Sequence, residues 1–345
     1  MLLIDRRAIA VALIACLAAC GADETPIEME ASTEPQWATL DGRAPLIIAH
    51  RGASGHRPEH TLEAYELAID QGADFIEPDL VATKDGVLVA RHDRYLSSTT
   101  NIAELDAFAE RRRPDPREQA GAPRREDWWV EDFTLAELKT LKARQPRPGR
   151  STEFDDQFDI PTFSEVLVMA TRKAQELNRS VGVYPETKSP GYFSSINLPF
   201  DQRLLAALEG YDAGPVFIQS FEPDILRRLY GKTNARLVQL VYEETPGAGS
   251  NVPLDEIAQY ADGVGPAKAI LDGDETFVAS AHALGLVVHP WTFRDDDVSE
   301  RTPEQELAFY SEMGIDGMFT DFPDTAAQWR DQAGSKPVPP PSGEN

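Results

Sequence analysis

Two carboxylates in one apolar run of the sequence have the spacing of metal ligands. Glu77 and Asp79 are separated by a single residue in FIEPDL (75–80), so in a strand both side chains point to the same face. Two carboxylates on one face repel each other unless a proton or a cation lies between them. A solvated edge strand would explain this pair taken alone. The surrounding apolar residues instead indicate a buried strand, where unpaired acids are costly.

A third carboxylate, Glu186, ends the next apolar run, VGVYPE (181–186). Three carboxylates form the oxygen ligand set that suits Ca²⁺ or Mg²⁺, with water or substrate oxygens completing the shell. Zinc is disfavoured because the cysteines, Cys16 and Cys20, both lie in the first twenty residues. The sequence therefore predicts one divalent cation, Ca²⁺ or Mg²⁺, and does not decide between the two.

Two histidines close neighbouring apolar runs. His50 ends LIIAH (46–50), and His92 follows the short run after the second strand. A single histidine at a strand end is more often structural, but two beside a carboxylate cluster favour general acid and base catalysis. The other histidines have no partner visible in the sequence, and we assign them no catalytic role: His56, His60, His282 and His289.

Two cations accompany these groups. Arg51 follows His50 directly, and its forked guanidinium can bind a phosphate oxygen. Lys188 follows Glu186 by two residues and supplies a second positive charge. The pair indicates an anionic ligand.

The elements that must position these residues alternate between short apolar runs and longer helical patterns. Eight runs read as strands: LIIAH (46–50), FIEPDL (75–80), VGVYPE (181–186), VFIQS (216–220), LVQLV (237–241), GVGP (263–266), LVVHPWT (286–292) and GMFT (317–320). Helical segments follow most of them, for example Pro58–Asp70, and Thr134 with Glu137 forms a capping box that begins another.

This alternation predicts an α/β protein with a parallel sheet. Eight units in about 280 residues match a TIM (β/α)₈ barrel, whose active site lies at the carboxyl ends of the strands. A doubly wound sheet would have fewer strands and usually a glycine-rich phosphate turn, which the sequence lacks. Pro78 lacks a ladder donor and predicts a local irregularity between the two acids.

One connection is too long for a simple barrel. More than sixty residues, about 96–159, separate Tyr95 from IPTFSEVL (160–167), so we expect an insertion after the second strand. Within it, residues 111–125 hold six arginines and only two acids. This basic segment could contact an anionic headgroup, but pairing with nearby acids, or mobility, is the simpler interpretation.

The amino terminus has the pattern of an export signal. Arg6 and Arg7 precede an apolar run that is too short to span a membrane, and a cysteine, Cys20, follows. Residues 17–20 (LAAC) resemble the lipobox of bacterial lipoproteins, which implies acylation of Cys20; an uncleaved anchor helix is the alternative. Gly21 after the cysteine resembles outer-membrane sorting signals, so we expect an exported protein anchored by lipid to the outer membrane and facing the periplasm.

The remaining boundaries follow from composition. Residues 1–19 would be the signal peptide, 20–43 a flexible tether, 44–332 the barrel, and 333–345 a disordered proline-rich tail. Lys plus Arg total 33 against 58 Asp plus Glu, a formal charge of −25 that argues against nucleic-acid binding. Because both cysteines precede residue 21, we expect no disulfide inside the mature chain.

Taken together, the motifs resemble the glycerophosphodiester phosphodiesterase family, notably its periplasmic bacterial branch. The stretch from Ile47 to Asn101 carries the amino-terminal signature, and the similarity continues through IPTFSEVL, PETK, QSFEPDILRRL, the Trp291 segment and GIDGMFTDFP. The resemblance implies a TIM barrel with this insertion. It places metal ligands on Glu77, Asp79 and Glu186, the catalytic pair on His50 and His92, and phosphate contacts on Arg51 and Lys188.

The resemblance also implies a reaction. A glycerol hydroxyl next to the phosphate attacks it, one histidine acts as base, and the other protonates the leaving alcohol. Water then opens the cyclic phosphate to release glycerol 3-phosphate. Phe221 and Trp291 are candidates for the wall of the glycerol or alcohol pocket, although aromatic residues in a barrel are core about as often. The sequence does not identify the leaving alcohol.

Two alternatives remain at this stage. The same barrel could act on lipids as a lysophospholipase D or sphingomyelinase D, in which case an apolar trough should admit acyl chains. A non-catalytic binding lipoprotein is the other alternative, because fold does not fix function. Such a protein would lack one of the histidines or carboxylates of the family, and this sequence retains all of the positions named above.

Overall fold

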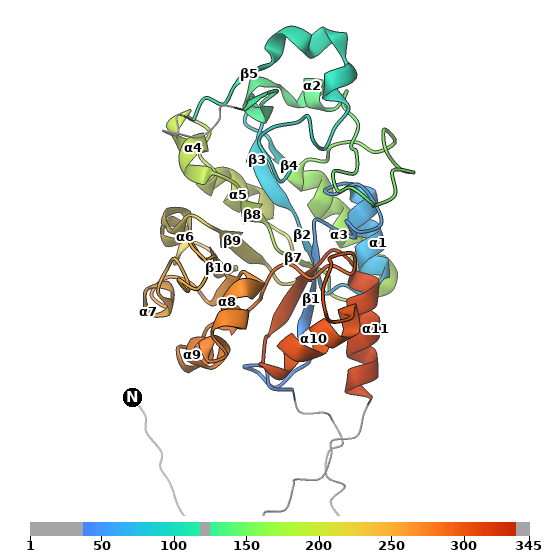
Figure 1. Ribbon diagram of the computed structural model, residues 1–345. Coiled ribbons are helices and arrows are strands. Elements are labelled where there is room, and N and C mark those ends of the chain that lie inside the picture. The colour runs from blue at the N-terminus through green and yellow to red at the C-terminus, as the bar shows by residue number, and fades with distance from the viewer. Residues whose placement is uncertain (1–36, 118–124, 336–345) are drawn as a thin grey trace, which may run out of the picture.

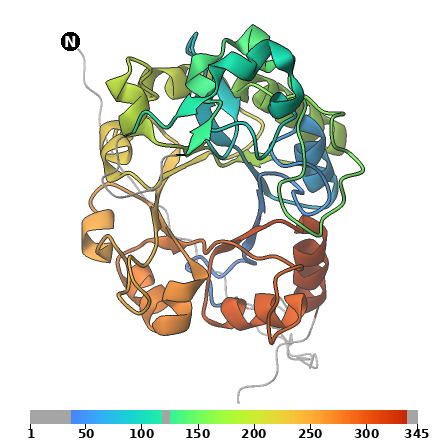
Figure 2. The same cartoon turned by 45° about the horizontal axis from the view of Figure 1, so that its top comes forward.

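Parallel strands close into a ring in the computed structural model, which describes residues 37–117 and 125–335 (Figures 1 and 2). Helices surround the ring, as Figure 2 shows, and each barrel strand leads into a helical segment. In order, the strands of the ring are β1 (Leu46–His50), β2 (Phe75–Glu77) with β3 (Asp79–Ala82), β7 (Gly182–Val183) with β8 (Glu186–Thr187), β9 (Phe217–Ser220), β10 (Arg236–Val241), β11 (Gly263–Pro266), β12 (Val287–Val288) and β13 (Gly317–Thr320). The predicted TIM barrel is confirmed.

Prolines divide two of the barrel strands into short pieces. Pro78 separates β2 from β3, which confirms the predicted irregularity, and its carbonyl still accepts a hydrogen bond from the Glu186 amide at 2.9 Å. The prediction of one continuous strand over 181–186 is wrong, because Pro185 divides β7 from β8. Both interruptions lie beside the candidate metal ligands.

Ten helices pack around the ring or follow its strands among the described residues. They are α1 (Leu62–Asp70), α3 (Phe163–Leu177), α4 (Pro190–Ser195), α5 (Asp201–Leu208), α6 (Pro223–Leu229), α7 (Leu254–Ile257), α8 (Lys268–Gly273), α9 (Phe277–Ala283), α10 (Pro303–Glu312) and α11 (Pro323–Gly334). The predicted start of the first helix at Pro58 is wrong. Thr61 caps that helix by accepting a hydrogen bond from the Ala64 amide, and the residues before it form turns.

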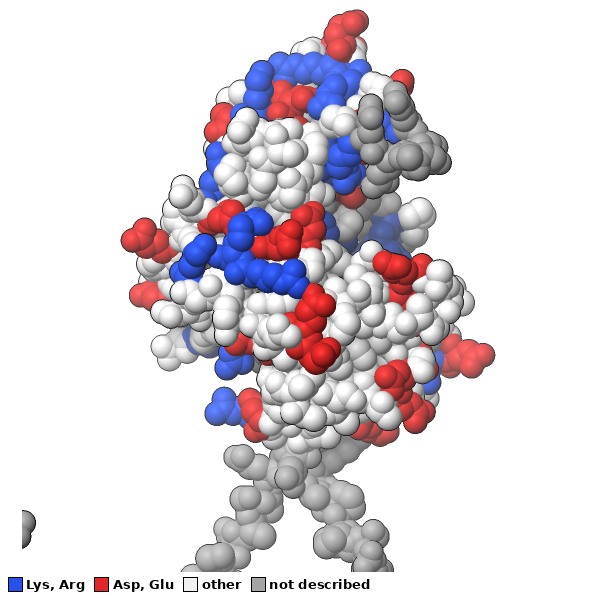
Figure 3. Space-filling view, turned by 90° about the vertical axis from the view of Figure 1, so that its left-hand side faces the viewer, with Lys and Arg blue, Asp and Glu red and all other residues white. Residues whose placement is uncertain are grey.

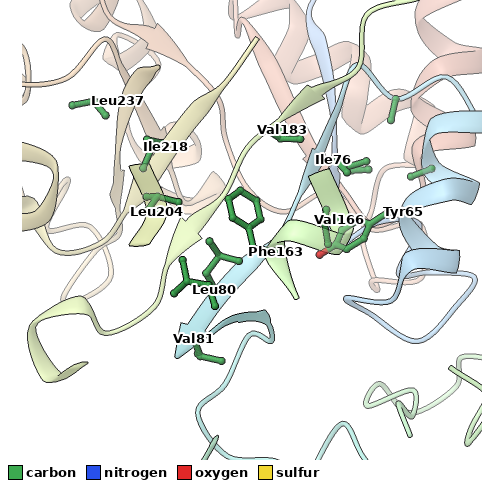
Figure 4. Close-up of a cluster of buried hydrophobic side chains, with 14 of the residues drawn as sticks. Tyr65, Ile76, Leu80, Val81, Phe163, Val166, Val183, Leu204, Ile218 and Leu237 are labelled. Carbon is green, nitrogen blue, oxygen red and sulfur yellow. The ribbon is translucent and has the colours of Figure 1, made fainter. Parts of the chain in front are cut away.

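The hydrophobic core has two layers, one on each side of the barrel wall. Apolar side chains of the strands pack against the helices outside, as Figure 4 shows for Leu80, Phe163 and Val166. A smaller cluster fills the barrel interior beneath the strand ends: Ile48, Phe75, Tyr184, Phe217, Val238 and Phe319. Because this interior is packed with side chains, a ligand can enter only at the end of the barrel.

The insertion lies over one side of the ring at the top of Figure 1. It follows the hairpin strand β4 (Leu88–Ala90), which pairs antiparallel with β3, and it precedes α3. Its regular elements are short: η1 (Ile102–Glu104), η2 (Asp106–Arg111), β5 (Arg113–Pro114), β6 (Glu126–Asp127), η3 (Val130–Asp132) and α2 (Leu135–Leu138). The predicted capping box of Thr134 and Glu137 is present at the start of α2.

The basic segment pairs with acids of its own insertion. Ion pairs join Arg111 to Glu137, Arg113 to Asp132, Arg117 to Asp115 and Arg125 to Asp127, with distances of 2.6 to 3.0 Å. Residues 118–124 of this segment lie outside the described chain. On the face in Figure 3, basic and acidic side chains are likewise interspersed. Pairing with nearby acids is therefore the correct interpretation for these four arginines, whereas Arg112 donates to the Glu126 carbonyl.

Both predicted boundaries of the barrel domain shift. Trp37 packs edge-on against Trp329 of α11 with ring centroids 6.0 Å apart, and the Leu40 amide donates to Asp316 at 2.6 Å. Residues 37–43 are therefore part of the domain rather than tether, and α11 continues to Gly334 into the predicted tail. Residues 1–36, with Cys20, and 336–345 lie outside the described chain. None of the helices in the described ranges is long and apolar enough to cross a membrane.

Candidate active site

A pocket opens where the strands of the barrel end. The predicted site residues that line it are His50, Arg51, Glu77, His92, Glu186, Lys188, Phe221 and Trp291. Asp79 is buried and lies within the same carboxylate cluster. The structure thus brings together every predicted site residue except Cys20, which lies outside the described residues.

Glu77, Asp79 and Glu186 offer carboxylate oxygens within 4.8 Å of one another, and all three residues are buried. Burial, together with the neighbouring carboxylates, raises the pKa of Glu77 well above its usual range. Burial also raises the pKa of Glu186 to about 8, against the opposing effect of Lys188. Burial and the neighbouring carboxylates thus both disfavour the ionised form, and a divalent cation would offset these effects.

The donor set fits a hard cation. All three side chains supply oxygen, as Ca²⁺ and Mg²⁺ require. The Asp79 Oδ1 atom is buried and has no hydrogen-bond partner among the described residues, so it is available as a ligand. The other oxygens of the cluster are oriented by the protein: Gln219 Nε2 donates to Glu77 Oε1 at 3.1 Å, and the Arg51 amide donates to Glu77 Oε2 at 2.9 Å.

His60 holds the other oxygen of Asp79. Its Nε2 lies 2.9 Å from Asp79 Oδ2, and its Nδ1 lies 2.7 Å from the hydroxyl of Tyr65. Burial lowers the pKa of His60 to about 4, so the neutral ring donates from Nε2 to Asp79 and accepts from Tyr65 at Nδ1. Sequence reasoning gave His60 no role, because its partners come from α1 and from the second barrel strand.

His50 pairs with an acid that sequence reasoning also missed. Its Nδ1 lies 2.6 Å from Oδ1 of Asp321, the residue that follows β13. Burial and the cation of Arg51 lower the pKa of His50 to about 4, against the opposing effect of Asp321. The neutral ring therefore donates from Nδ1 to Asp321 and keeps a free lone pair on Nε2. The strand-end position of Asp321 was the available signal.

His92 is presented by the turn that follows β4. Its Nδ1 lies 3.2 Å from the Asp93 carboxylate, and its side chain is 31% exposed. The preceding residue, Arg91, is buried and fixes the turn by donating to the carbonyls of Glu59 and Thr99. The two histidines differ in their surroundings, since His50 is held in a buried pair and His92 is open to the pocket.

Cations and aromatic rings both line the pocket, and Lys188 Nζ lies 5.8 Å from the centroid of the Phe221 ring. Arg51 Nη1 donates to Glu59 at 2.9 Å, and Lys188 Nζ lies 2.8 Å from Glu186 Oε1. Phe221 packs edge-on against Trp291, with ring centroids 5.6 Å apart. Both predicted aromatic residues are therefore pocket wall. Arg294 is a further lining cation, which sequence reasoning did not identify.

An eight-stranded parallel barrel with polar groups gathered at its strand ends has the architecture of TIM-barrel enzymes. The chain belongs to the glycerophosphoryl diester phosphodiesterase family, whose family model matches residues 50–325. It is therefore a phosphoric diester hydrolase.

Individual relatives agree with this assignment. The chain is 33% identical to the glycerophosphodiester phosphodiesterase GDPD6 of Arabidopsis thaliana, over 82% of this chain and 85% of that protein. It is 32% identical to the glycerophosphodiester phosphodiesterase of Haemophilus influenzae, over 82% and 89% of the two chains. Its fold is similar to that of an Oleispira antarctica phosphodiesterase solved in complex with the product sn-glycerol-3-phosphate, with a TM-score of 0.61, 21% identity, and coverage of 85% of this chain and 99% of that one.

The carboxylate cluster leads to a prediction about cation binding. Ca²⁺ or Mg²⁺ at about one hundred times its dissociation constant should raise the melting temperature by about 5 °C, because a bound cation offsets the buried like charges. The Glu186→Gln variant should show no such gain. In EDTA its melting temperature should be at least as high as that of the parent, because one buried negative charge is removed. Differential scanning calorimetry checks both. Asp224→Asn, which removes an exposed acid on α6, should keep the full gain; an equal gain in Glu186→Gln would contradict the site.

Proposed function

We propose that this protein hydrolyses glycerophosphodiesters to glycerol 3-phosphate and an alcohol, with one divalent cation bound by Glu77, Asp79 and Glu186. The observation that carries the proposal is the buried carboxylate cluster beside two histidines and three cationic side chains in one pocket. Membership of the family and the product-bound Oleispira antarctica neighbour support the same substrate class.

The cation and the basic side chains would act together on the phosphate. A divalent cation supplies Lewis-acid chemistry, which polarises a phosphoryl oxygen and offsets developing charge. Arg51 is preorganised for the phosphate, because Glu59 and Asp79 hold its guanidinium at 2.9 and 3.4 Å. Lys188 adds a second charge from the adjacent strand end. These groups are fixed before substrate arrives, so little reorganisation accompanies the reaction.

The two histidines suit different proton transfers. His50 is neutral and its Nδ1 is bound to Asp321, so Nε2 can accept the proton of the attacking glycerol hydroxyl. His92 lies on the more exposed side of the pocket, with Asp93 at its Nδ1, and can deliver a proton from Nε2 to the leaving alcohol. The same pair, with roles reversed, would activate water for the opening of a cyclic phosphate.

The pocket favours a deacylated substrate over a lipid. Its lining combines charged side chains with two aromatic rings, Phe221 and Trp291, and provides the wall for a small alcohol rather than a trough for acyl chains. This lining argues against the lysophospholipase D and sphingomyelinase D alternatives.

Release of glycerol 3-phosphate from glycerophosphocholine tests this function. We expect activity that EDTA abolishes and that falls by roughly 10²–10⁴-fold in Glu77→Ala and in His50→Ala, because each removes a group that acts on the reacting atoms. His282→Ala, on α9 outside the pocket, should retain activity within about twofold. Choline release from lysophosphatidylcholine, without activity on deacylated diesters, would instead support the lipid alternative. Inactivity on both would support a binding lipoprotein.

We also propose that Cys20 carries the lipid anchor that holds the domain on the outer membrane, facing the periplasm. The lipobox-like residues 17–20 and Gly21 support this proposal. In a Gram-negative host, the full-length chain should incorporate labelled palmitate and fractionate with the outer membrane, and Cys20→Ser should lose both. Cys16→Ser is the matched control and should keep both. An unlabelled chain that stays in the membrane would point to an uncleaved anchor helix.

A further inference from the structure

One arginine of the insertion makes more contacts around the pocket than its neighbours in sequence. The side chain of Arg150 is only 4% exposed. Its Nη2 donates to Asp321 Oδ2 at 2.7 Å, and its Nη1 donates to the Ser54 carbonyl at 3.1 Å. The Nε and Nη2 atoms also form a two-pronged contact with the Asp296 carboxylate, at 2.7 and 3.0 Å. Arg150 therefore joins the loops after the first, seventh and eighth barrel strands.

The contact with Asp321 matters because this carboxylate holds His50. Oδ1 of Asp321 accepts from His50 Nδ1, while Oδ2 accepts from Arg150 and also from Arg294 Nε at 2.9 Å. Burial would raise the pKa of Asp321, but His50, Arg294 and Arg150 together hold it below its usual range. The carboxylate is thus ionised, and the two guanidinium groups that hold Oδ2 fix the direction in which Oδ1 faces His50.

Nearby arginines of the same segment lack this arrangement. Arg147 pairs with Asp297 at 2.8 Å, and both side chains are 39% exposed. Arg144 pairs with Glu104 and Asp156, both of which are substantially exposed. Exposed pairs of this kind contribute little to stability. Asp297 also lies 3.6 Å from Arg294 of the pocket lining, whereas both partners of Arg144 belong to the insertion itself. Arg150 differs because it is buried and contacts a group that touches a candidate catalytic residue.

We propose that Arg150 is a positioning residue, which acts through Asp321 to hold the His50 ring with its proton on Nδ1 and its Nε2 free. The proposal rests on the function proposed above, in which His50 is the base. The proposal gives the insertion a role in catalysis. The insertion follows the second barrel strand, but through Arg150 it would hold His50, which ends the first barrel strand. A planar guanidinium is required, because it must contact two carboxylates and a carbonyl at once.

A double-mutant cycle tests the proposal, with glycerol 3-phosphate release from glycerophosphocholine as the assay. Arg150→Met should lower kcat by roughly tenfold and leave KM within about twofold, because ground-state contacts are untouched. Asp321→Asn should lower kcat by roughly 10²-fold or more, as expected when the partner that fixes a catalytic imidazole is lost. In the Asp321→Asn background, Arg150→Met should have less than about a twofold further effect, because its route to His50 is already broken.

The matched control is Arg144→Met, whose parent side chain pairs with Glu104 and Asp156 of the insertion, and it should leave kcat unchanged in both backgrounds. Arg150→Lys keeps the charge without the planar fork, so it should give an intermediate kcat. If circular dichroism shows that Arg150→Met does not fold, Arg150→Lys takes its place in the cycle. Equal losses of kcat from Arg150→Met with and without Asp321 would show a merely structural role and overturn the proposal.

Failure of the proposed function has a different outcome. An inactive parent chain would remove both proposals together. If the parent chain is active and the Asp321→Asn variant keeps full activity, only the positioning role is overturned, because the His50–Asp321 pair would then have no part in turnover. Activity that depends on Asp321 but not on Arg150 would likewise overturn only the present inference.

Discussion

The mouth of this barrel is organised around three buried carboxylates held within 4.8 Å of one another. Like charges so close together, away from water, are stable only if protons or cations offset them. The surrounding residues supply part of that compensation. Lys188 and Arg51 approach the cluster from two strand ends, and the neutral His60 donates to Asp79. A divalent cation would supply the rest, and the same positive charges would then bind a phosphate.

The scaffold places these groups with short, interrupted strands. Pro78 and Pro185 break the second and third barrel strands beside the ligands, while the carbonyls of both prolines still accept hydrogen bonds from adjacent strands. The barrel interior below is filled with aromatic and aliphatic side chains, so the polar groups are confined to the open end. The insertion then ties the loops above the ring together through Arg150, whose contacts reach the partner of His50.

Much of the site could be predicted from the sequence, because apolar runs identify the strands and the catalytic end of a barrel follows from them. Glu77, Asp79, Glu186, His50 and His92 all close or follow such runs. Asp321 also follows such a run, although the run does not show that its partner is His50, whereas His60 and Arg150 follow none of the predicted strands. Asp321 and Arg150 have partners far away in the chain, at sequence separations of 271 for Asp321 with His50 and 171 for Arg150 with Asp321, whereas His60 is 19 residues from Asp79.

The boundaries that sequence reasoning placed wrongly also depend on contacts that a sequence pattern does not show. Composition marked residues 37–43 as tether, but the packing of Trp37 on Trp329 attaches them to the domain. The first helix begins at Leu62 rather than Pro58, because the preceding residues turn back to bring Arg51, Glu59 and His60 to the cluster. Hydrophobic periodicity does not show that a segment folds back to place its side chains against polar groups elsewhere in the protein.

The most direct test of the central claim is anomalous diffraction from crystals soaked in Mn²⁺, a cation that shares the preference for oxygen ligands. A single strong peak should appear among Glu77, Asp79 and Glu186, with carboxylate oxygens at about 2.0–2.6 Å. A peak elsewhere, or no peak while the three carboxylates keep their positions, would contradict the account of this site as a cation centre.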